Sequence, residues 1–208
     1  MLADLFNLVK EEATDSVINN PSIPNEKNEA VLADATHSVA AGLQSELADG
    51  GLQNVLSLFG GNTTQTPGTG RLLNNPIVGN IINNFTNKLT NNHGIPGSQA
   101  SSIATSLITG VIGKLIHRSN DPNNSSFDIG SIIGSLTGGS MPANTGNGFD
   151  LQSMVNRFSE GKLDANNDGH IGFDDIINKI TNGAKAEQQQ NQSTGGGLLD
   201  TIKGFFVK

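Results

Sequence analysis

The stretch from 99 to 117 constrains the fold most, because it carries apolar residues at helical spacing on most of its sides. A helix that is apolar nearly all round is normally buried, since no face of it suits water. We therefore expect this segment to form the core of a domain, with other helices covering it. Its apolar positions are Ile103, Leu107, Ile108, Val111, Ile112, Leu115 and Ile116.

Other segments repeat an apolar residue every three or four positions, which predicts amphipathic helices that can supply this cover. They are 2–19 (stopped by Pro21), 26–48, Leu52–Phe59, 77–91, 129–137 and 151–159. Asn25, Asp128 and Asp150 precede three of these segments, Ser98 precedes 99–117, and all four are predicted to be helix caps. The sequence thus predicts an all-α fold, a bundle of short helices.

Composition limits the size of the core. Apolar residues make up 35% of the chain and aromatic residues 4%, so the core must be built from Leu, Ile, Val and Phe. Glycine and asparagine each number 26, and both are poor helix formers, so short helices and many turns are expected. The chain has no cysteine, which excludes disulfides and thiolate metal sites.

Charge and hydropathy bear on the partners. The net charge is −7, and the basic residues are scattered, whereas nucleic acids and anionic membrane surfaces attract clustered positive charge. No apolar stretch reaches the ~20 residues that span a bilayer. The N-terminal segment does not follow the signal-peptide pattern. We expect no nucleic-acid partner, no membrane span and a cytoplasmic location, with an extracellular one left open.

The segment DANNDGHIGFDD, Asp164–Asp175, follows the twelve-residue template of an EF-hand calcium loop. The predicted calcium ligands are Asp164, Asn166, Asp168, His170 and Asp175. Four of them offer side-chain oxygens, whereas His170 would contribute its main-chain carbonyl. Gly169 stands at position 6, where the loop turns sharply. Because Ca²⁺ takes about six to eight oxygen ligands, this spacing predicts a calcium site.

Apolar residues on both sides of the loop predict an entering and an exiting helix. They are Met154, Val155 and Phe158 before the loop, and Phe173, Ile176, Ile177 and Ile180 after it. Asp replaces Glu at position 12 and Gly172 offers no ligand at position 9, so we expect weak binding, ~10⁻⁵–10⁻³ M. The alternative is a surface turn rich in Asp, Asn and Gly that binds no metal.

Other residue patterns indicate no enzyme active site. The four histidines, His37, His93, His117 and His170, are far apart, and none lies at a spacing typical of metal ligands. GxSxG and GxxxxGK[ST] motifs are absent. The paired carboxylates Glu11–Glu12 fit a solvated helix face. We expect a protein without catalytic activity; a hydrolase with an unrecognised site is a less favoured alternative.

Three short segments rich in Leu, Ile and Gly, LQNVLSLFGG, NPIVGNIINNF and FDIGSIIGSLTGG, resemble the YidB-like bacterial family of unknown function. NNPSIPNEKNEAV and LLDTIKGFF are similar to its Bacteroidetes-type version, in which a dockerin-like loop follows. The resemblance covers most of the chain and implies an all-helical, homeodomain-like fold without a known activity. The calcium loop resembles the dockerin type, which ends in Asp. Dockerins carry two such loops, so cohesin binding is not implied.

These observations divide the chain into four parts. They are a helical YidB-like domain at 1–139, an EF-hand-type helix–loop–helix at 149–182, a flexible linker at 183–197 and an amphipathic helix at 198–208. The last helix could dock on its own core or on a second copy. The sequence favours a non-enzymatic calcium-binding protein that has a structural role or binds itself or a protein partner. By fold analogy, the alternative is a regulatory or nucleic-acid-associated module.

Overall fold

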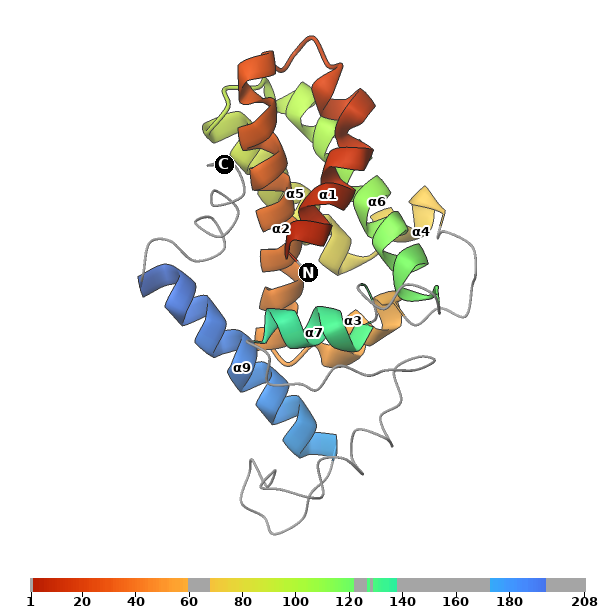
Figure 1. The fold of residues 1–208 in the computed structure, drawn as a ribbon, viewed down its shortest axis with the longest axis vertical. Coiled ribbons are helices and arrows are strands. Elements are labelled where there is room, and N and C mark those ends of the chain that lie inside the picture. Colours follow the sequence, from red (N-terminus) through yellow and green to blue (C-terminus); the bar gives the residue numbers. More distant parts are fainter. Residues whose placement is uncertain (1, 60–67, 122–126, 128, 138–172, 194–208) are drawn as a thin grey trace.

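The computed structural model describes residues 2–59, 68–121, 127, 129–137 and 173–193, and their regular structure is helical throughout (Figure 1). This confirms the predicted all-α fold. In chain order the elements are α1 Leu2–Ala13, η1 Thr14–Ile18, η2 Asn25–Lys27, α2 Asn28–Ala48, α3 Leu52–Phe59, α4 Thr69–Leu73, α5 Pro76–Asn91, α6 Gly97–Ser119, α7 Ile129–Leu136 and α9 Phe173–Ser193. The predicted helices 151–159 and 198–208 lie outside the described residues.

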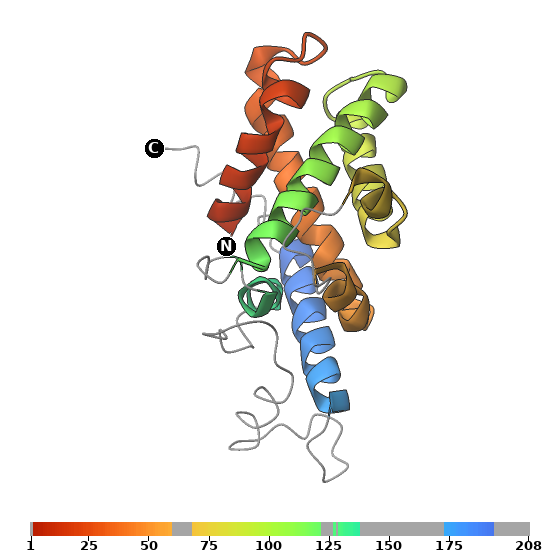
Figure 2. The ribbon, with the colours of Figure 1, turned by 90° about the vertical axis from the view of Figure 1, so that its right-hand side faces the viewer.

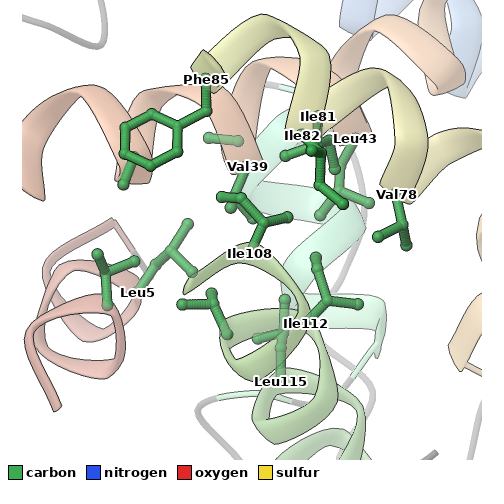
Figure 3. Packing of buried hydrophobic residues seen from close by; sticks show 14 of the residues in the cluster. Leu5, Val39, Leu43, Val78, Ile81, Ile82, Phe85, Ile108, Ile112 and Leu115 are labelled. Atoms are coloured by element: carbon green, nitrogen blue, oxygen red, sulfur yellow. The ribbon is translucent and has the colours of Figure 1, made fainter. Parts of the chain in front are cut away.

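Helix α6 is the buried centre that its sequence predicts. All seven of its predicted core residues are at most 5% exposed. Helices α1 and α5 each contact both α2 and α6, so these four helices enclose one apolar core. Figure 3 shows side chains of α1, α2, α5 and α6 meeting in it. Helices α3 and α4 contact α6 as well.

Among the helices described here, only α6 is long and apolar enough to cross a membrane, judged by length and composition. It reaches 23 residues because the Ser- and Thr-containing turns at its start are helical too. The sequence-based expectation of no membrane span therefore stays a prediction. Of the most apolar part of α6, 61% is buried inside the bundle, as the central position of this helix requires.

Two predicted helix caps are wrong. Helix α6 begins at Gly97, immediately after the extended residue Pro96, so Ser98 lies inside its first turn. Asn25 starts the short helix η2 directly after Pro24, and α2 begins only at Asn28. In both places the proline is the extended residue before the first helical turn, with ψ of 137° at Pro24 and 138° at Pro96, and no side-chain cap forms.

The sequence suggested that Glu11 and Glu12 form a solvated helix face. In the structure they lie against basic residues of α6. Glu12 Oε1 lies 2.6 Å from Lys114 Nζ, and Arg118 Nη2 donates to Glu11 Oε2 at 2.7 Å. The Arg118 guanidinium also lies 5.4 Å from the centre of the Phe127 ring. These side chains are partly exposed, so each ion pair contributes at most about 1 kcal/mol to stability.

Helices α7 and α9 close one end of the bundle (Figure 2). Gln44 of α2 donates a buried hydrogen bond of 2.9 Å to the carbonyl oxygen of Leu136, at the end of α7. Helix α9 packs against α2 and α7, and its Gly183 lies against Thr137: a Cβ at Gly183 would be 2.9 Å from the Thr137 carbonyl oxygen.

Helix α9 extends beyond the boundary that the sequence suggested. A flexible linker was expected from residue 183, yet the helix continues to Ser193. Residues 184–190, AKAEQQQ, are good helix formers, so helical propensity carries the helix past Gly183 despite the low complexity of the segment. The remaining linker residues, 194–197, lie outside the described part of the chain.

Gly42 lets α2 and α5 approach closely, and this gives a test of the packing. A Cβ at Gly42 would overlap the Ile81 side chain, which is 1% exposed. We expect Gly42→Ala to lower the free energy of unfolding by about 1 kcal/mol or more, because overpacking outweighs the gain in helix propensity. Urea unfolding measures this change.

Gly79 on α5 is the matched control, because nothing lies within 4 Å of the position of its Cβ. We expect Gly79→Ala to raise the free energy of unfolding by about 0.5–1 kcal/mol, since alanine is the better helix former. Stabilisation by both substitutions would show that α2 and α5 are not in close contact at Gly42.

Candidate functional site

The structure describes one end of the predicted calcium-binding segment. Asp164, Asn166, Asp168 and His170 lie outside the described residues, whereas Asp175 lies in the first turn of α9. The ligand set therefore stays a prediction. The exiting helix is confirmed, because Phe173–Ile180 is helical throughout. In the described part of the chain, no three His, Asp or Glu side chains are arranged to hold a metal ion.

The exiting helix is packed on the bundle through one face. Ile177 is partly buried against the core, Ile180 is 1% exposed and Ala184 is fully buried. Their spacing of three and four residues places them on the side of α9 that meets α2 and α7. The carboxyl end of the predicted loop is thus continuous with a helix that is held against the rest of the protein.

A second polar site, which the sequence did not predict, lies between α2 and the end of α5. Asp34, His37, Lys88 and His93 form this site, called the polar joint below. Asp34 Oδ2 lies 2.8 Å from His93 Nε2, and Asp34 Oδ1 lies 3.5 Å from Lys88 Nζ. These three side chains are at most 20% exposed. One carboxylate therefore joins two basic groups at the rim of the core.

Local structure explains how these residues meet. Asp34 and His37 are three residues apart on α2, so they share one side of the helix. Gly94 adopts a positive φ of 72°, and its N–H donates to the Thr90 carbonyl at 3.2 Å. This turn ends α5 and brings His93 toward α2.

Two hydrogen bonds reinforce the joint from neighbouring residues. Lys27 Nζ donates to the His93 carbonyl oxygen at 2.9 Å, and Asn92 Nδ2 donates to Asp34 Oδ2 at 3.3 Å. The joint thereby connects η2, α2 and the turn after α5. These contacts fix the turn to the start of the long helix α2.

Burial shapes the electrostatics of the joint. Burial, and after it the nearby charge of Lys88, lower the pKa of His37 to about 4, with Asp34 acting in the opposite direction. Burial also lowers the pKa of Lys88, against which Asp34 acts by charge and hydrogen bonding. His37 Nδ1 is buried and finds no hydrogen-bond partner within the described structure.

This arrangement is suited to holding two helices together and to responding to protons. Ser38 is the hydroxyl next to His37 in the chain, and it donates to the Asp34 carbonyl at 2.8 Å within its own helix. That hydroxyl is therefore not presented to either histidine as a nucleophile.

The only sequence signal for the joint was the spacing of Asp34 and His37 on one helix. His93 is 59 residues from Asp34 in the chain, so the sequence does not show that these two side chains meet.

Comparison of the chain with protein-family models, curated proteins and solved structures found no match. The resemblance to the YidB-like family and to dockerin loops therefore stays a prediction.

The contribution of the polar joint to stability can be measured by neutralising Asp34. We expect Asp34→Asn to lower the free energy of unfolding at neutral pH by about 1–3 kcal/mol, because Lys88 would stay mostly buried without an anion. Urea unfolding gives this value. The exposed Glu29 on the same helix provides the control, and Glu29→Gln should change it by less than about 0.5 kcal/mol. Equally small changes in both variants would show that the joint contributes nothing.

Proposed function

We propose that this chain is a non-enzymatic calcium-binding protein in which the loop Asp164–Asp175 is coupled to the helical bundle through α9. The observation that carries the proposal is the position of α9. It begins at Phe173, within the last three residues of the loop, and it packs on α2 and α7. Calcium binding would therefore act on a helix that is already part of the fold.

The physical link is the ligand at the end of the loop. An EF-hand is a helix–loop–helix unit, and its position-12 carboxylate belongs to the exiting helix. In this chain position 12 is Asp175, in the first turn of α9. When the ligands close around calcium, they would fix the start of this helix. Without the ion, the clustered carboxylates repel one another, so binding and ordering are coupled.

Asp174 and Asp175 at the start of α9 are also consistent with this role. The N-terminus of a helix carries a partial positive charge, which favours negative side chains in its first turn. The same charge favours the ionised carboxylate that a calcium ligand requires. The positive end of the α9 dipole thus favours acidic residues at these positions and the ionised form of the proposed ligand Asp175.

The module would act by binding a protein partner or a second copy of itself, because the described residues offer no nucleophile paired with a base. The alternative, a nucleic-acid-associated module, gains no support from the charge distribution. Lys88, Lys114 and Arg118 are engaged by carboxylates of α1 and α2. Their positive charge is therefore largely neutralised within the protein.

Calcium titration by calorimetry tests the proposal. We expect saturable binding at one site with a Kd of ~10⁻⁵–10⁻³ M, since the loop ends in Asp and lacks a side chain at position 9. Asp164→Ala should abolish this heat because it removes the first ligand. The exposed Asp49 is the control, and Asp49→Ala should leave binding unchanged. The proposal fails if the wild type shows no saturable heat, or if Asp164→Ala binds calcium as tightly as the wild type does.

A further inference from the structure

We propose that the polar joint is an acid-sensitive contact: a proton taken up by His37 has no anion of its own, and its uptake loosens α5 from α2. This inference is independent of the calcium loop, because Asp34, His37, Lys88 and His93 all belong to α2, α5 and the turn after α5.

The joint contains one anion for several basic groups. Asp34 contacts both Lys88 Nζ and His93 Nε2, and it also accepts a hydrogen bond from Asn92. The ionisable groups that act on the His37 ring are Lys88 from α5 and Asp34 from its own helix. Lys27, from η2, is a further cation of the joint, and it donates a hydrogen bond to the His93 carbonyl oxygen. A charged His37 would therefore add a cation beside Lys88, while the nearest carboxylate is already shared.

The Nδ1 atom of His37 has no hydrogen bond in the described structure that would stabilise a proton on it. The atom is buried, so a proton placed there would be poorly solvated. Buried polar groups without partners are costly, and the cost rises when the group is charged. The closed contact between α2 and α5 thus favours the neutral ring.

Linkage gives the direction and range of the effect. In the closed protein the pKa of His37 is lowered to about 4, whereas a hydrated histidine has a pKa of about 6.5. A group with a depressed folded-state pKa of this kind binds protons better when the contact opens. Opening is therefore favoured by up to about tenfold per pH unit as the pH falls from about 6.5 to about 4. The partial exposure of the ring makes this factor an upper limit.

Loosening would start at the end of α5. Lys88 lies in the last turn of α5, and His93 follows in the turn that leads to α6. The preceding turns of α5 are held by the apolar residues Ile81, Ile82 and Phe85, which do not titrate (Figure 3). Acid should therefore weaken the contacts of the joint before it affects the apolar core. Because these contacts stabilise the folded chain, its free energy of unfolding should fall as they weaken.

The test is urea unfolding of the full chain between about pH 7.5 and about pH 4.5, with a chelator present throughout so that calcium binding does not contribute. We expect the wild type to lose stability as the pH falls through this range, and His37→Gln to lose markedly less. His117→Gln removes an exposed histidine of α6 and should follow the wild type. Parallel losses in the wild type and His37→Gln would overturn the proposal.

Proton NMR of the histidine rings provides a second reading that does not depend on a variant. We expect the His37 ring of the folded wild type to titrate with a midpoint near pH 4. The amide signals of Lys88 and His93 should shift as the contact loosens. A His37 ring that titrates near its ordinary value of about 6.5 while these amides stay unchanged would overturn the proposal.

Discussion

The burial of α6 is the constraint on which the rest of the structure depends. This helix is apolar on most of its sides, and its seven core residues are almost completely removed from water. Helices α1 and α5 cover it and also contact α2, so these four helices enclose one apolar core. The seven buried Leu, Ile and Val side chains of α6 each contribute about 1.5–3 kcal/mol of transfer free energy, which outweighs the surface ion pairs.

Polar contacts at the rim of this core determine which helix faces meet. The Asp34 carboxylate joins α2 to the end of α5, and Gln44 joins α2 to the end of α7. Buried polar contacts add little net stability, yet they are costly when one partner is lost. These polar contacts therefore favour one arrangement of the helices, whereas apolar contacts alone are compatible with several. Helix α2 takes part in both contacts and also receives α9.

The sequence predicts much of this fold because helix formation here follows a local pattern. The apolar spacing of α3, α5 and α6 identified these helices, with ends within about two residues of those observed. Prediction from the sequence failed where contacts between distant residues, or neighbouring residues in the chain, determine the local structure. Helix α6 begins directly after Pro96, so Ser98 is not its cap, and Glu11 and Glu12 meet basic residues more than 100 positions away. The polar joint was missed for the same reason, since its histidines are distant in the chain.

The candidate calcium site shows a different limit of prediction from sequence. Its ligand pattern is local and therefore readable from the sequence, but the way in which it is linked to the bundle is not. Only the structure shows that the helix after the loop packs on α2 and α7, through Ile180 and Ala184. If the loop binds calcium, this packing would couple the ion to α9 and to the helices that α9 contacts.

Hydrogen exchange with and without calcium tests the proposed coupling most directly. Helix α9 follows the loop, whereas α6 lies in the centre of the core. If calcium closes the loop, its removal should speed exchange in the amides of α9 and leave those of α6 almost unchanged. Exchange in α9 that is the same with and without calcium would contradict the account, because the helix would then be independent of the loop that precedes it.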